Sequence, residues 1–123
     1  TYIQCGACHT PVMQTSSSPI AQLNNVEFYP YTDLLLHDMG AGLDDAYTEG
    51  KAMTYEWRTP PLWGLGLTQN AQGGDIYLLH DGRARSIEEA ILLHRGEAEQ
   101  SQINYSELSD EDKALLLAFL ESL

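Results

Sequence analysis

A single five-residue stretch near the amino terminus, Cys5-Gly6-Ala7-Cys8-His9, most constrains what this chain can fold into. The pattern C-x-x-C-H is the attachment signature of c-type haem. Two thiols three positions apart on one helical turn can each form a thioether to one porphyrin, and His9 can then offer an imidazole nitrogen to the iron. Gly6 and Ala7 are small, so the backbone can lie close to the ring edge. The motif therefore predicts one covalently bound haem c, held by Cys5, Cys8 and His9.

Two other uses of closely spaced cysteines fit this sequence less well. A redox-active dithiol gives the adjoining His9 no role and is typical of a βαβ context, which the sequence does not predict. A structural zinc ion usually takes four protein ligands, but Cys5 and Cys8 are the only cysteines of the chain. Haem attachment uses both cysteines and the histidine, so we favour it.

Length and charge bear on the domain organisation and the partners. The chain has 123 residues, which fits one domain, 1–123, with a modest core that a haem would help to fill. We expect this c-type haem domain to be excised from, or part of, a longer protein, because a helix usually leads into C-x-x-C-H. The formal net charge of −12 argues against nucleic acid as a partner and favours a redox protein partner with a basic surface.

The attachment chemistry also predicts a location. Haem is attached to such motifs outside the cytoplasm, so we expect a periplasmic or secreted protein. The sequence shows no signal peptide, which indicates a mature or excised segment. No apolar run reaches the length needed to cross a bilayer, so we expect no membrane insertion.

The hydrophobic pattern predicts a mostly α domain with long loops. Residues 1–9 should form a short helical turn, and 10–25, rich in Ser, Pro and Asn, a surface loop. Two β-like runs, 26–29 and 33–38, are separated by Pro30 and should pair as a small β-hairpin.

Two helices have clear start signals near the carboxyl terminus. Ser86 and Glu89 form a capping box ahead of an apolar run that Gly96 should end. Ser109, followed by three acidic residues, should begin the last helix, whose apolar face continues to Leu123.

Three later blocks carry a family resemblance: 31–40 (YTDLLLHDMG), 56–66 (EWRTPPLWGLG) and 79–86 (LHDGRARS). In this order they resemble the C-terminal haem domain of the bacterial di-haem oxidoreductases, described as thiol oxidoreductases. These are relatives of the bacterial di-haem cytochrome c peroxidases and of MauG. The resemblance implies a mostly α, class I cytochrome c-like haem domain with long loops and a small β-hairpin. The family carries two haems on two domains, whereas this chain has one C-x-x-C-H motif.

The resemblance also implies where the second axial ligand of the iron lies. In the related peroxidases that ligand follows the helix after the His-x-Gly segment, and the matching position here is His94. The apolar face of this helix can dock on the haem through Ile87, Ala90 and Ile91. The alternative is that His94 is only a cation favoured at a helix carboxyl end. We predict His9 and His94 as the iron ligands.

Other methionines and histidines compete for the same role. Met39 is the runner-up ligand, because it lies in a glycine-flanked loop, although plain packing is the commoner use of Met. Met13 and Met53 have weaker contexts. His37 and His80 each precede an aspartate, which suits a structural, hydrogen-bonded histidine better than a ligand.

Further candidate haem contacts lie in the aromatic and proline-rich segment 57–66. Arg58 can offer a forked donor to a haem propionate, although pairing at the surface would explain it equally well. The carbonyls of 59–61, with Pro60 among them, can accept the N–H of the proximal histidine and so fix its tautomer. Trp63 is the remaining candidate contact. Two other arginines could bind a propionate: Arg83 and Arg85.

Two classes of function remain open at this point. An electron-transfer cytochrome domain needs a six-coordinate iron and no substrate pocket, and we favour it. A peroxidase or thiol oxidoreductase needs an open iron position and an acid–base group beside it. No residue stands out as catalytic, since His37 or Glu56 would have to be assigned arbitrarily, so the sequence does not decide whether the chain is an enzyme by itself.

Overall fold

The computed structural model describes residues 3–123, so the first two residues of the expected helical turn lie outside the described part. Within this part there are four α-helices: α1 (Thr68–Ala71), α2 (Ile87–Leu92), α3 (Glu99–Ser106) and α4 (Asp110–Glu121). Short 3-10 turns connect them to the rest: η1 (Cys5–Ala7), η2 (Ala21–Leu23), η3 (Ala41–Leu43), η4 (Leu65–Leu67) and η5 (Gly96–Ala98). Four short strands complete the list: β1 (Met13–Gln14), β2 (Glu27–Phe28), β3 (Leu36–Asp38) and β4 (Glu56–Arg58).

The described part is a small mixed α/β domain rather than the mostly α domain that the sequence predicted. The helices are short, and loops and two antiparallel strand pairs account for much of the chain. The helical start signals are confirmed: the Ser86 hydroxyl accepts the Glu89 N–H at 3.0 Å, and the Ser109 hydroxyl accepts the Asp112 N–H at 3.1 Å.

The predicted hairpin between 26–29 and 33–38 is wrong. β2 pairs with β1, with Met13 opposite Phe28, and β3 pairs with β4, with His37 opposite Trp57. The chain between β2 and β3 has positive φ at Tyr31 (53°) and at Leu34 (62°), so it bends away instead of closing a tight turn. The expected loop 10–25 therefore contributes a strand of its own.

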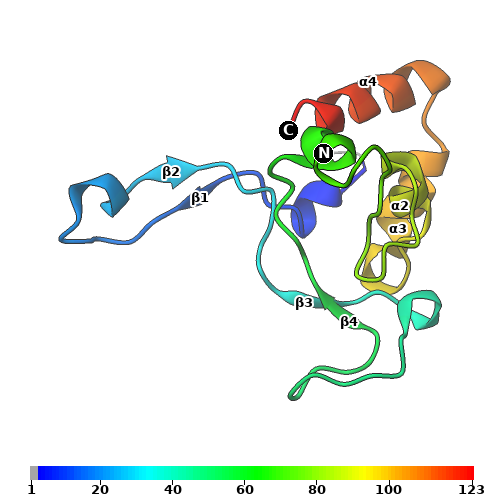
Figure 1. Ribbon diagram of the computed structural model, residues 1–123, viewed down its shortest axis with the longest axis horizontal. Helices are drawn as coiled ribbons and strands as arrows, with labels where there is room; N and C mark the ends of the chain where they lie inside the picture. Colours follow the sequence, from blue (N-terminus) through cyan, green and yellow to red (C-terminus); the bar gives the residue numbers. More distant parts are fainter. Residues whose placement is uncertain (1–2) are drawn as a thin grey trace.

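The β1–β2 pair forms an arm that projects from the rest of the domain (Figure 1). The helices α2, α3 and α4 gather at the opposite side, and η1, drawn in blue, lies between the arm and these helices. At the base of the arm the Trp63 indole N–H donates to the Tyr29 carbonyl at 2.6 Å, and the Trp63 ring lies 6.1 Å from that of Phe28.

The apolar core of the described residues is small. The fully buried hydrophobic side chains are Leu43, Ala84 and Tyr105, whereas several large ones remain exposed, among them Leu34, Leu35, Leu36 and Trp63. Of residues 3–123, no helix is both long and apolar enough to traverse a bilayer. A flat apolar group laid against the segment 34–36 would add burial that the side chains alone do not provide.

Candidate functional site

The C-x-x-C-H motif forms a tight turn, as the sequence predicted. η1 carries Cys5, and the His9 N–H donates to the Cys5 carbonyl at 2.9 Å, so both thiols and the imidazole leave one compact loop. Gln4, with φ of 65°, sets the direction in which the chain enters. Burial raises the pKa of both the Cys5 and the Cys8 thiol.

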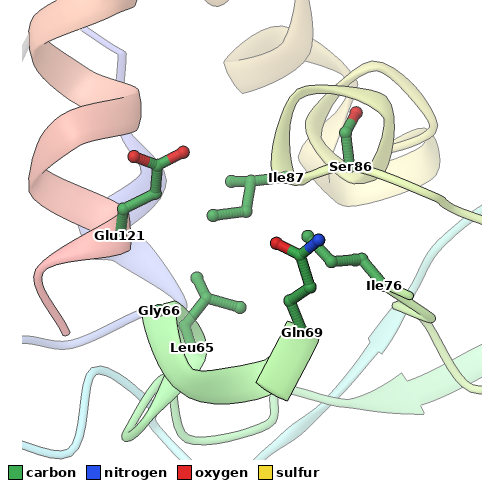
Figure 2. A pocket seen from close by; sticks show the side chains of 7 residues that line it. All are labelled: Leu65, Gly66, Gln69, Ile76, Ser86, Ile87 and Glu121. Carbon is green, nitrogen blue, oxygen red and sulfur yellow. The ribbon is translucent and has the colours of Figure 1, made fainter. Parts of the chain in front are cut away.

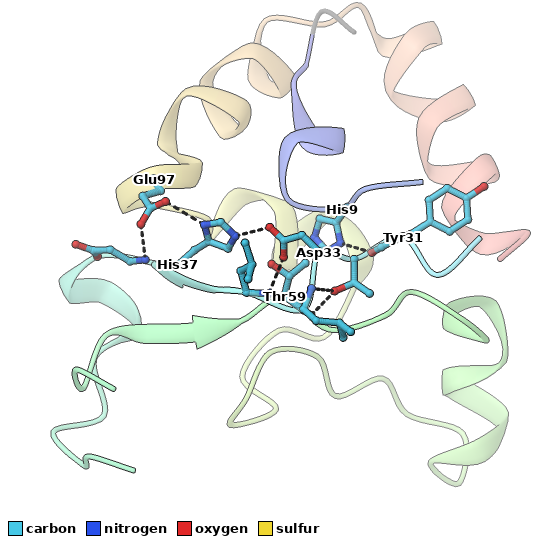
Figure 3. Close-up of polar contacts among 10 residues, drawn as sticks. His9, Tyr31, Asp33, His37, Thr59 and Glu97 are labelled. Carbon is cyan, nitrogen blue, oxygen red and sulfur yellow. Dashed lines mark hydrogen bonds and ion pairs between the residues drawn. The ribbon is translucent and has the colours of Figure 1, made fainter. Parts of the chain in front are cut away.

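The His9 ring is oriented by a backbone carbonyl. Its Nδ1 lies 3.0 Å from the carbonyl oxygen of Tyr31 (Figure 3). A carbonyl can only accept, so Nδ1 carries the proton and Nε2 keeps its lone pair. Burial lowers the pKa of His9, which holds the ring neutral at pH 7. The imidazole is thereby prepared to bind a metal ion through Nε2.

We expected the His9 ring N–H to donate to one of the carbonyls of 59–61, but it donates to the Tyr31 carbonyl. The left-handed backbone of Tyr31 turns its carbonyl toward His9, while the Thr59 carbonyl accepts the Thr32 hydroxyl at 2.6 Å. Nothing in the sequence pattern marks this role, because a backbone acceptor is independent of residue type. Pro60 follows Thr59, which is bonded to Thr32, Asp33 and Leu35.

His94 is prepared in the same way as His9. It lies two residues beyond the end of α2, and its Nδ1 donates to the Ala90 carbonyl at 2.7 Å, one helical turn earlier. Burial lowers the pKa of His94 as well, so its Nε2 also keeps a lone pair at pH 7.

The two prepared imidazoles lie at a separation that suits one metal ion between them. The ring centres of His9 and His94 are 6.5 Å apart, with 47° between the ring planes. Two imidazoles on opposite sides of one ion have ring centres roughly 6.2 Å apart, if each metal–nitrogen bond is about 2.0 Å and each ring centre about 1.1 Å further back. With the two thiols of the adjoining turn, this donor set fits a c-type haem.

The runner-up ligand, Met39, follows β3 and is partly buried. Its N–H donates to the Tyr55 carbonyl at 2.9 Å. The next residue, Gly40, packs so closely on Arg95 that an added Cβ would lie 3.0 Å from the Arg95 Cβ. Met39 therefore lies in a loop that packs on the segment following His94, whereas the ring paired with His9 is that of His94.

His37 lies between two carboxylates that the sequence analysis did not single out. Its Nε2 is 2.7 Å from Asp33 and its Nδ1 is 2.9 Å from Glu97 (Figure 3). The hydrogen bonds to Glu97 and then to Asp33 raise the pKa of His37. Neither contact left a local signal, because a spacing of four residues predicts a contact between Asp33 and His37 only on a helix, which this segment does not form, and Glu97 is 60 positions away.

Cys8, Asp33 and His37 could also hold a metal ion, because one ligand atom of each lies within 4.8 Å of the others. Both nitrogens of His37 already have carboxylate partners, so an ion here would have to displace one of them. A thioether at Cys8 would also replace the thiolate that such a site needs. The cluster suits the surroundings of an attached haem better than a separate metal centre.

The remaining candidate contacts are more dispersed. Arg58, at the end of β4, is exposed, while Arg83 pairs with Asp81 and Arg85 lies 3.9 Å from the centre of the Tyr77 ring. Trp63 is 62% exposed and holds the base of the arm. His80 stacks on Trp57, with ring centres 3.5 Å apart.

A cavity of about 440 Å³ lies elsewhere, between η4, the start of α2 and the end of α4 (Figure 2). It is lined by Leu65, Gly66, Gln69, Ile76, Ser86, Ile87 and Glu121, so it includes neither the cysteines nor the two prepared histidines. Ile87, expected to dock on the haem, lines this cavity (Figure 2).

The turn with two thiols and the paired imidazoles define a candidate haem-binding site, and comparison with known families agrees. The chain belongs to the family described as "Di-haem oxidoreductase, putative peroxidase", whose model matches residues 1–123. This confirms the resemblance read from the sequence. Neither the curated proteins nor the solved structures contain a match.

Proposed function

We propose that this chain binds one haem c through thioethers at Cys5 and Cys8, with His9 and His94 as the two axial ligands of its iron. The observation that carries the proposal is the 6.5 Å separation of the two rings, each of which uses Nδ1 on a backbone carbonyl. Both Nε2 atoms are then available to one ion. In this proposal the domain has a class I cytochrome c-like arrangement around the haem.

With both axial positions taken by histidines, the activity we propose is transfer of single electrons. A bound haem would supply the one-electron chemistry. The chain itself holds each imidazole neutral and oriented, so that neither ligand has to reorient when the charge at the site changes. Arg58 is proposed to bind a propionate, because its guanidinium is exposed whereas Arg83 and Arg85 already contact Asp81 and Tyr77. Pro60 and Trp63 remain candidate haem contacts.

A second candidate function follows from the family description, which names a peroxidase. Such an enzyme needs an open position on the iron, and it would require His94 to be displaced from the site. The position of the His94 ring favours the electron-transfer function for this domain. A di-haem enzyme would then combine this domain with a second haem carried elsewhere.

The location and the partners are proposals of the same kind. Haem attachment to a C-x-x-C-H motif supports a periplasmic or secreted protein, and we propose that 1–123 acts as one haem domain of a longer protein. The net charge of −12 supports a redox partner with a basic surface and argues against nucleic acid.

The test is the optical spectrum of the protein expressed together with a haem-attachment system. Denatured protein should keep its haem and give a c-type pyridine haemochrome, because thioethers survive acid extraction. The native ferric protein should show low-spin bands. Extraction of the haem by acidified solvent would contradict covalent attachment. A high-spin charge-transfer band would favour the peroxidase instead.

A further inference from the structure

Three side chains connect the segments that carry the two prepared histidines. Asp33 lies two residues after Tyr31, whose carbonyl orients His9, and Glu97 lies three residues after His94. His37 stands between them, 2.7 Å from Asp33 and 2.9 Å from Glu97 (Figure 3). The same chain of contacts passes close to Cys8, whose Sγ lies within 4.8 Å of the ligand atoms of Asp33 and His37.

The geometry requires His37 to be an imidazolium. Each of its nitrogens faces a carboxylate oxygen, and a neutral ring can donate only one hydrogen bond. Hydrogen bonds between charged groups are the strong ones in proteins, and the His37 and Asp33 side chains are each 15% exposed, so water competes weakly for that bond, whereas the Glu97 side chain is 56% exposed. The His37–Asp33 bond is therefore the better shielded of the two, and the His37–Glu97 bond extends the connection to the segment after His94.

Both carboxylates are themselves fixed. The Asp33 carboxylate accepts the Leu35 N–H at 2.9 Å, and Glu97 accepts the Asp38 N–H at 3.0 Å. The segment after His94 also fits tightly on β3, since a Cβ at Gly96 would lie 2.2 Å from the Asp38 carbonyl. Movement of the His94 backbone away from His9 would act against this packing and the His37–Glu97 bond together.

We propose that Asp33, His37 and Glu97 form a brace that holds His94 on the iron, with His37 as the positioning residue. The inference rests on the proposed function, because it assumes that His9 and His94 are the axial ligands. The brace acts by joining the His9 side of the site to the His94 side, so its loss should make the release of a histidine more frequent without removing any ligand.

The test measures how fast carbon monoxide binds to the reduced, haem-loaded protein after rapid mixing. Carbon monoxide needs an open coordination position, so its binding rate reports how often a histidine leaves the iron. His37→Phe keeps a ring but removes both N–H groups, and the rate should rise roughly tenfold through the loss of charge-assisted hydrogen bonds. Glu97→Gln keeps an acceptor for the Asp38 N–H but loses the charge, so it should give a smaller rise.

A matched control separates positioning from general loss of stability. Ser109→Ala removes the cap of α4, which is not part of the brace, and should lower the melting temperature while leaving the rate within about twofold of wild type. The double variant His37→Phe/Glu97→Gln should be no faster than His37→Phe alone, because both changes break the same His37–Glu97 contact.

The brace is overturned if His37→Phe and Glu97→Gln bind carbon monoxide no faster than Ser109→Ala. Failure of the proposed function looks different, since wild-type protein would then have a high-spin spectrum, or His94→Ala would leave the spectrum unchanged. If His37→Phe does not fold, Glu97→Gln alone decides the question.

Discussion

The hydroxyl of Thr32 is fully buried and donates to the carbonyl of Thr59 at 2.6 Å. The same oxygen accepts the Leu34 N–H at 2.9 Å, so one atom ties the segment just after the Tyr31 carbonyl, which orients His9, to Thr59. The segment 57–63, which the sequence marks by its tryptophans and prolines, reaches the site through this contact.

Removal of the Thr32 hydroxyl should therefore lower the stability of the protein more than the loss of an exposed hydroxyl would. Thr32→Val keeps the shape but leaves the buried Thr59 carbonyl and the part-buried Leu34 N–H without this partner, so the free energy of unfolding should fall by about 1–3 kcal/mol. Thr15→Val is the matched control, because the Thr15 hydroxyl makes similar bonds on the exposed arm, where water can replace it. Denaturant unfolding of the haem-loaded proteins measures both. Equal losses would contradict the argument.

The axial ligand can be tested by removing each candidate in turn. His94→Ala should open the sixth position and shift the ferric iron to high spin, whereas Met39→Ala should leave the visible and near-infrared spectra nearly unchanged. A bis-histidine iron should also have a lower reduction potential than a methionine-ligated one. If the two variants behave the other way round, Met39 is the ligand.

The brace should stabilise the folded protein over a limited pH range, with the stabilisation lost at both high and low pH. Its contacts raise the pKa of His37, so this stabilisation is complete below the ordinary value of 6.5 and is lost as pH rises through the raised value. The His37 hydrogen bond lowers the pKa of Glu97, so that part is complete above 4.5 and is lost as pH falls. Burial acts to raise the pKa of Asp33, but hydrogen bonds from the Leu35 N–H and from His37 outweigh it, so the net shift is downward.

The free energy of unfolding of wild type minus that of His37→Phe should therefore be largest between the ordinary values of 4.5 and 6.5 and should shrink on either side. Denaturant unfolding across acidic and alkaline buffers measures this difference. A difference that keeps growing in alkali would show that His37 is not protonated in the folded protein.

Position 96, two residues after His94, should tolerate only glycine because of its backbone conformation and its close packing. Its φ is +59°, and an added Cβ would lie 2.2 Å from the Asp38 carbonyl oxygen. Gly96→Ala should therefore destabilise the protein by at least about 1 kcal/mol and change the visible spectrum of the ferric haem through the displacement of His94. Gly42→Ala is the control, since nothing lies within 4 Å of a Cβ there. Thermal unfolding and the ferric spectrum measure both, and equal effects would contradict this account.

The local parts of the site could be predicted from the sequence, and the distant contacts could not. The C-x-x-C-H turn and the caps at Ser86 and Ser109 depend on neighbours within a few positions, and the structure has them as expected. Tyr31 and Glu97 act through a backbone carbonyl and through a contact 60 positions away, for which local patterns give no signal. The strand pairing failed for the same reason, because β4 lies beyond a long loop.

The arm has a consequence for how lengths can vary along this chain. Its two ends meet at the base, where the Thr32 N–H donates to the Thr10 carbonyl at 3.1 Å and the Leu62 N–H to the Pro30 carbonyl, also at 3.1 Å. The arm is therefore a closed excursion, and the entry and exit points stay fixed whatever its length. Residues added to or removed from its tip need not move His9 or Tyr31. Among relatives, we expect insertions and deletions to accumulate at this tip, because a change of length there leaves the base of the arm in place.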